Sequence, residues 1–133
     1  MRTDHALILW VAAGSAVGGV LRHLTGDLFR LIGWLDWPWD TLTANVLGSL
    51  VIGWFAALTA VAGRWPLGMV PREFVITGIL GGYTTFSLFS LDTISLMNAG
   101  QWGAALANMF ATLVLCLTAV WLGYRIGHRA ADR

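Results

Sequence analysis

Residues 78–90, with the sequence GILGGYTTFSLFS, lie in an uncharged run that extends from Phe74 to Leu91. An apolar run of this length predicts a membrane helix, but a Gly-Gly pair (81–82) and two threonines (84–85) stand in its middle. Glycine weakens a helix, and threonine hydroxyls compete for its backbone hydrogen bonds. In lipid an opened backbone is tolerated only beside protein or a water-filled cavity. The run therefore predicts a helix broken at mid-membrane, next to an ion or substrate site. The Gly81-Gly82 pair is predicted to be the point at which the backbone leaves helical geometry.

The composition is that of a membrane protein. Of the 133 residues, 57% are hydrophobic and 11% are charged, whereas a soluble domain has about 25% charged residues. A bilayer core of about 30 Å requires roughly 20 apolar residues per helix. Four segments meet this requirement: residues 5–24, 41–62, 73–97 and 102–125, with approximate ends. We therefore predict an all-α integral membrane protein, with residues 1–133 forming a single four-helix transmembrane domain.

The arginines are unevenly distributed about these spans. Two, Arg22 and Arg30, lie on one side, and the side of the termini carries six: Arg2, Arg64, Arg72, Arg125, Arg129 and Arg133. Taken alone, this asymmetry places both termini in the cytoplasm. We interpret the first segment as a retained helix, because its apolar part is longer than a typical signal-peptide core. The net charge of +1 and the absence of a basic helix give no indication of a nucleic-acid partner.

Three of the spans carry uncharged polar residues at helical spacing. These are Thr41, Asn45 and Ser49 in the second span, Ser87 and Ser90 beside the face of Phe86 and Phe89 in the third, and Asn108, Thr112 and Cys116 in the fourth. Such residues often mediate helix packing, and for Ser49, Ser90 and Cys116 packing and function are equally supported. Asn45 must face a partner, a cavity or water, because burying an unpaired amide costs several kcal/mol. Without a mid-span carboxylate or lysine, this path suits a small anion better than a cation.

Three motifs follow one another along the chain: Gly-Gly-x-x-Arg at 18–22, Thr-Leu-x-x-Asn at 41–45 and Gly-x-x-Gly-Gly-x-Thr-Thr-Phe-Ser-x-Phe-Ser at 78–90. In this order, and with this length and four-span plan, the chain resembles the small Fluc-type bacterial fluoride channels over nearly all of its residues. The resemblance implies an antiparallel, dual-topology homodimer with two pores, lying as a multi-pass protein in the lipid of the bacterial inner (plasma) membrane. It implies passive fluoride export, and hence fluoride resistance.

The resemblance also implies roles for individual residues. The pore residues would be Phe86, Phe89, Asn45, Thr41, Ser87, Asn108 and Thr112, with Cys116 on the polar track of the fourth helix. A central structural sodium ion would be bound by the backbone carbonyls of Gly81 and Thr84 from each subunit. Three positions depart from the family pattern, which usually has an aromatic residue at Asn108, serine or threonine at Cys116 and glutamate at Asp92. The arginine asymmetry is also larger than dual topology favours.

The physical chemistry of these side chains fits a fluoride path. Fluoride is small and strongly hydrated, so a pore must replace its water with hydrogen-bond donors. Phenylalanine ring edges carry the positive part of the ring quadrupole and can face an anion without binding it tightly. The Asn45 amide offers two N–H donors, and each hydroxyl offers one. A series of narrow, weakly attractive sites allows both entry and exit.

Two other classes of membrane protein remain as alternatives. A proton-coupled small multidrug transporter would need a carboxylate within its first span, where this chain has only Asp4 at the very start. A non-transporting subunit of a membrane complex would use the glycines and threonines for packing alone. An enzyme is not predicted, because the sequence has no HExxH motif and no Cys/His cluster, and its histidines (His5, His23 and His128) fall at segment ends.

Overall fold

The computed structural model describes residues 2–131, and these residues form helices and connecting loops without a strand. Three long helices are continuous: α1 (Arg2–Leu31), α2 (Trp39–Leu58) and α6 (Trp102–Ala131). Between α2 and α6 lie four shorter elements, α3 (Met69–Glu73), the π-helix η1 (Phe74–Leu80), α4 (Gly81–Tyr83) and α5 (Phe86–Asn98).

Four segments are long and apolar enough to cross a membrane: His5–Leu31, Trp39–Leu58, Met69–Asn98 and Trp102–Ala130. The prediction of an all-helical protein with four membrane spans is therefore confirmed. Large apolar side chains face outward on the first and last helices, where Leu9, Leu113 and Leu117 are all more than half exposed. In a water-soluble protein this surface would be unfavourable, whereas in a bilayer it meets lipid.

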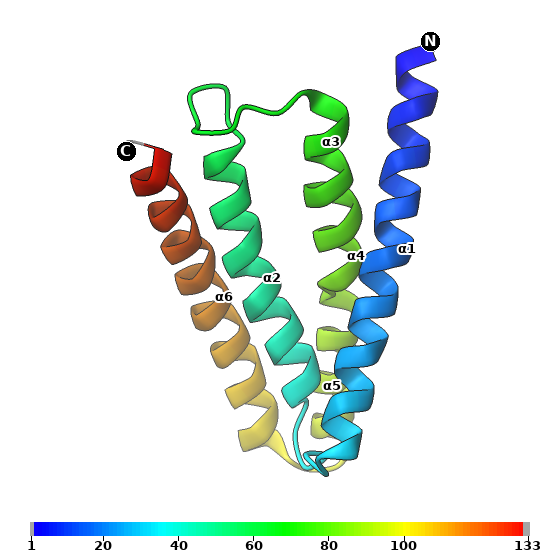
Figure 1. Cartoon of the computed structure of the whole chain (residues 1–133). Coiled ribbons are helices and arrows are strands. Elements are labelled where there is room, and N and C mark those ends of the chain that lie inside the picture. The colour runs from blue at the N-terminus through cyan, green and yellow to red at the C-terminus, as the bar shows by residue number, and fades with distance from the viewer. Residues whose placement is uncertain (1, 132–133) are drawn as a thin grey trace.

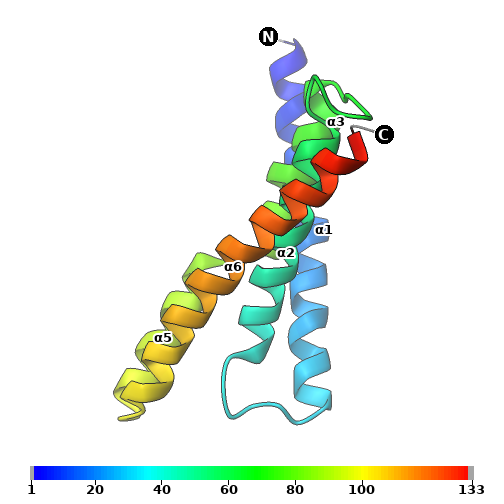
Figure 2. The ribbon, with the colours of Figure 1, turned by 90° about the vertical axis from the view of Figure 1, so that its left-hand side faces the viewer.

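The helices pack as two pairs. Figure 1 shows α1 beside the α3–α4 segment and α2 beside α6, with both ends of the described chain at the same end of the bundle. In Figure 2, α5 and the adjoining half of α6 diverge from the lower ends of α1 and α2. In Figure 1 the two pairs spread apart toward the end that carries the chain termini, so the bundle is not closed at either end.

Two glycines allow the members of each pair to approach closely. A Cβ atom added at Gly18 would lie 2.1 Å from the carbonyl oxygen of Ile79, and one added at Gly123 would lie 2.0 Å from that of Leu50. Both distances are far below van der Waals contact, so only glycine fits. Small residues at such crossings are the usual means of packing helices in lipid, where no hydrophobic effect drives association.

Several helix ends differ from the predicted bounds. α1 continues to Leu31 instead of ending near residue 24, because Asp27 pairs with His23 and Arg30 on the same helix face. α2 ends at Leu58 instead of 62, where the chain turns and the Leu58 carbonyl accepts from the Trp65 N–H of the following loop. The ends of α1 and α2 therefore differ from the ends of the apolar runs in the sequence. The side chains of Arg2 and Arg133, counted in the arginine asymmetry, lie outside the described residues.

Gly123→Ala should destabilise the protein by about 1–3 kcal/mol, because its methyl group would push the α2 backbone away from α6. Gly103→Ala, on the same helix but with open space around its Cβ position, should leave stability unchanged or slightly raised. Thermal unfolding of the detergent-purified variants measures both effects. Equal melting temperatures for the two variants would contradict this packing.

Candidate functional site

Thr84 and Thr85 have extended backbones between the helical residues of α4 and α5. Their φ and ψ angles are −85° and 153° for Thr84, and −149° and 123° for Thr85. The Gly-Gly pair, predicted to leave helical geometry, instead remains helical, and Gly81 has φ −66° and ψ −35°. That prediction was wrong by a few residues because β-branched threonine favours extended conformations. Gly82 serves packing, since a Cβ there would lie 2.6 Å from the Ser15 carbonyl oxygen.

The side chain of Asn45 pairs with the backbone of Thr85 at two points. Its Nδ2 donates to the Thr85 carbonyl oxygen over 3.0 Å, and its Oδ1 accepts from the Thr85 N–H over 2.8 Å. Asn45 is 8% exposed, so these bonds supply the partner that a buried amide requires. The amide thereby satisfies backbone groups that have left the helical ladder.

The two threonine hydroxyls complete the hydrogen bonding around this pair. Thr84 donates from both its hydroxyl and its N–H to the Leu80 carbonyl, over 2.9 and 3.0 Å. The Thr85 hydroxyl caps α5 by accepting from the N–H of Leu88 over 3.2 Å. An N-terminal threonine cap of this kind satisfies one of the free donors at a helix start.

In this arrangement, two backbone carbonyls lack the N–H donors that they would have in a continuous helix. In a continuous helix, the Thr85 N–H would bond the Gly81 carbonyl and the Leu88 N–H would bond the Thr84 carbonyl. Here these N–H groups donate to the Asn45 and Thr85 side chains. The Gly81 and Thr84 carbonyls are also the predicted sodium ligands, and neutral oxygens suit a hard monovalent cation. Among the described residues no group of histidine, cysteine, aspartate and glutamate side chains could hold a metal ion.

A cavity of about 400 Å³ opens beside the extended pair, between α2, α5 and α6. Phe86 and Phe89 contribute adjacent rings, with centroids 5.4 Å apart and planes inclined at 44°. Phe86 is 79% exposed within a single chain. None of the residues lining this cavity is charged, and its polar lining is formed by Asn45, Ser49, Thr84, Thr85, Thr112 and Cys116. The Thr112 hydroxyl is buried and has no partner among the described residues.

The structure gathers some predicted site residues in this cavity and places others outside it. Phe86, Phe89, Asn45, Thr112 and Thr84 line it, whereas Thr41, Ser87, Asn108 and Gly81 do not. Thr41 accepts a hydrogen bond from Arg22, Ser87 is exposed and bonds the Thr85 hydroxyl, and Asn108 is fully buried.

The Asn108 Nδ2 donates to the Thr93 hydroxyl over 2.9 Å, across the contact between α6 and α5. Its Oδ1 is buried and has no partner among the described residues. Sequence reasoning gave Thr85 no role at the site, although it lines the cavity and pairs with Asn45. The available signal was the requirement that the Asn45 amide find a buried partner.

Together, the fold and the cavity define a small four-span membrane protein with an uncharged, partly aromatic and partly hydrogen-bonding cavity between its helices. Residues 9–124 match the family described as CrcB-like protein, Camphor Resistance (CrcB). The chain belongs to this family and is a multi-pass bacterial membrane protein.

Several similar proteins carry a functional name. The fluoride-specific ion channel FluC of Opitutus terrae is 50% identical over 119 residues, covering 90% of this chain and 90% of the relative. The fluoride-specific ion channel FluC 1 of Rhodopseudomonas palustris is 45% identical over 129 residues, covering 97% and 92%. The fluoride-specific ion channel FluC of Nitrobacter winogradskyi is 50% identical over 121 residues, covering 90% and 93%.

Asn45→Ala should lower stability clearly, because it leaves the N–H and the carbonyl of Thr85 without their partners, at about 1–3 kcal/mol for each buried group. Asn45→Asp keeps an acceptor for the Thr85 N–H but turns a buried carboxylate oxygen toward the Thr85 carbonyl oxygen, so its loss should be at least as large. Thermal unfolding in detergent measures both. The exposed Asn98→Ala is the control; a loss as small for Asn45→Ala as for this control would contradict the pairing.

Proposed function

We propose that this protein is a fluoride-selective ion channel through which fluoride leaves the cell passively, giving fluoride resistance. The observation that carries the proposal is the uncharged cavity in which the rings of Phe86 and Phe89 meet amide and hydroxyl groups. Relatives at 45–50% identity over most of the chain are named fluoride-specific ion channels, and a channel is a transporter and not an enzyme.

The cavity offers a small anion hydrogen-bond donors without fixed charge. The Asn45 amide has two N–H donors, and its bond to Thr85 uses one of them, which leaves the other for an ion. The buried Thr112 hydroxyl has no partner among the described residues and is a second donor. The ring edges of Phe86 and Phe89 add weak positive potential. Because no single contact is strong, an ion that enters can also leave.

The remaining predicted pore residues extend this path or support it. We assign Thr41, one helical turn from Asn45, to the end of the path that contains the α1–α2 loop. Ser87 is exposed beside the rings and would contact ions at a surface completed by a second subunit. Asn108 would act by holding α6 against α5 through Thr93, since it is fully buried in the single chain.

The proposal includes an antiparallel homodimer with two pores, inserted in lipid in both orientations, whose third span is broken at mid-membrane. A sodium ion at its centre would be held by the Gly81 and Thr84 carbonyls of both subunits. This assignment is supported by the Thr85 and Leu88 N–H groups, which donate to side chains and not to these two carbonyls. When bound, sodium would neutralise the facing carbonyl dipoles and hold the two extended pairs together.

Purified protein in liposomes should dissipate a fluoride gradient rapidly once a potassium ionophore balances the charge, while chloride should hardly move. Fluoride- and chloride-selective electrodes record both ions in parallel. Chloride efflux comparable to that of fluoride would overturn the channel assignment. A requirement for a proton gradient would instead indicate a coupled transporter.

Phe86→Ile and Phe89→Ile should each reduce fluoride efflux by at least about tenfold, because isoleucine preserves apolar volume but lacks the positive ring edge. Phe110→Ile is the matched control, since Phe110 is 65% exposed on α6 and does not line the cavity. Size-exclusion chromatography verifies that all three variants keep the oligomeric state of the parent protein. Normal efflux in both cavity variants would show that the rings serve packing alone.

A further inference from the structure

Arg22 is held at the start of α2 by a carboxylate and a hydroxyl. Its Nη2 lies 3.0 Å from the Asp40 Oδ2 and 2.9 Å from the Thr41 Oγ1, and it donates to both. The Arg22 side chain is only 11% exposed. Because water and salt screen a buried charge weakly, the charge balance around this guanidinium strongly affects any ion that passes nearby.

A second carboxylate joins this group from α5. The Asp92 side chain interacts with the Thr41 hydroxyl and with the charges of Asp40 and Arg22, and its Oδ2 is buried without a partner among the described residues. One guanidinium therefore faces two carboxylates, and the formal charge of the Arg22–Asp40–Asp92 cluster is −1.

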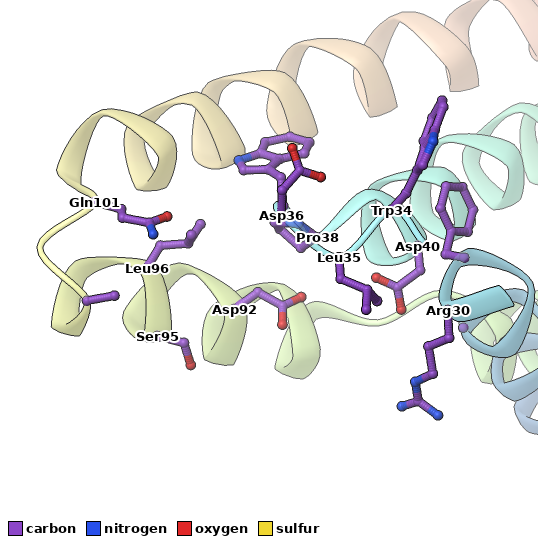
Figure 3. A pocket seen from close by; sticks show the side chains of 14 residues that line it. Arg30, Trp34, Leu35, Asp36, Pro38, Asp40, Asp92, Ser95, Leu96 and Gln101 are labelled. Carbon is purple, nitrogen blue, oxygen red and sulfur yellow. The ribbon is translucent and has the colours of Figure 1, made fainter. Parts of the chain in front are cut away.

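Asp40 and Asp92 line a cavity of about 390 Å³ between the α1–α2 loop, α5 and the start of α6, which we call the outer cavity. Figure 3 shows their carboxylates turned toward the same space, while the Arg30 side chain extends away from them. Arg30 is instead paired with Asp27, over 3.2 Å at an exposed position. The Arg22–Asp40–Asp92 cluster thus sets the local potential at this side of the outer cavity.

This cluster lies at one end of the proposed fluoride path. Thr41 is four residues from Asn45 in α2, about one turn or roughly 6 Å along the helix. Asn45 lines the cavity that holds the phenylalanine rings. An ion that moves between that cavity and the α1–α2 end of the molecule therefore passes within about a helical turn of the cluster.

We propose that Asp40 limits the fluoride flux, because its carboxylate gives the Arg22–Asp40–Asp92 cluster a net negative charge at this end of the path. Arg22 with Asp92 alone would form a neutral cluster, whereas the addition of Asp40 makes the cluster repel anions. Asp40 need not touch the ion, since it acts through the potential that the cluster creates. This inference rests on the proposed fluoride channel function.

The test compares initial fluoride efflux from liposomes at a fluoride concentration below saturation. Asp40→Asn removes the charge but keeps an oxygen that can accept from Arg22, and efflux should rise by about three- to tenfold. Asp40→Glu keeps the charge and should remain within about twofold of the parent. Asp27→Asn is the matched control, since it also removes a carboxylate from an arginine pair at the same end of α1, and its efflux should likewise stay within about twofold.

The outcomes separate this inference from the function on which it rests. Fluoride efflux by the parent protein tests the channel function, and the ratio of variant to parent tests Asp40. Chloride efflux should stay low in every variant, which excludes a general leak. Unchanged or reduced efflux in Asp40→Asn would overturn the inference, as would an equal rise in Asp27→Asn. If Asp40→Asn does not fold, Asp40→Ser must give the same rise, and failure of both variants to fold would assign Asp40 a structural role instead. A parent protein without fluoride efflux would overturn the proposed function and this inference together.

Discussion

The two hydrogen bonds between the Asn45 side chain and the Thr85 backbone support the rest of the site. They allow Thr84 and Thr85 to remain extended inside an apolar segment, because the buried N–H and carbonyl of Thr85 keep hydrogen-bond partners. The extended pair ends one helix and starts another, so that α5 leaves the line of α4 and carries Phe86 and Phe89 toward α6. Because the Thr85 N–H donates to Asn45, it does not bond the Gly81 carbonyl. Asn45 thus links the proposed anion path to the proposed sodium site.

Close helix packing places Asn45 where it can make these bonds. The glycine contacts at Gly18 and Gly123 bring α1 against η1 and α4, and α2 against α6, to backbone distances that no side chain would permit. α5 packs mainly on α6, and both diverge from the lower ends of α1 and α2 (Figure 2). Close packing through small residues within each helix pair therefore leaves room for a cavity between α2, α5 and α6 without a large apolar core.

Much of this structure could be predicted from the sequence, because hydropathy and length determine membrane spans directly. The four spans and the α-helical class follow from these two properties, and residues 78–90 indicate a candidate site near the Gly-Gly and Thr-Thr pairs. The phenylalanine pair and Asn45 could also be chosen from local patterns. The position of the extended residues could not, because glycine serves both flexibility and close packing, and only the neighbouring Ser15 backbone shows which role Gly82 has.

The partners of the polar side chains were equally inaccessible to sequence reasoning. The structure gives Arg22 two direct partners, Asp40 and Thr41, from a helix that begins eight residues after α1 ends. Thr41 and Asn108 have the spacing of cavity residues, yet tertiary contacts with Arg22 and Thr93 remove them from the cavity lining. Helical spacing predicts a shared face, but the neighbouring helices decide which part of that face meets open space.

A crystal structure of the detergent-solubilised protein, at a resolution that defines side-chain amides, would show directly whether Asn45 pairs with the Thr85 backbone. We expect an extended Thr84–Thr85 backbone, with the Asn45 amide about 3 Å from both the backbone nitrogen and the carbonyl oxygen of Thr85. A continuous helix from Met69 to Asn98, with the Asn45 side chain directed elsewhere, would contradict this expectation.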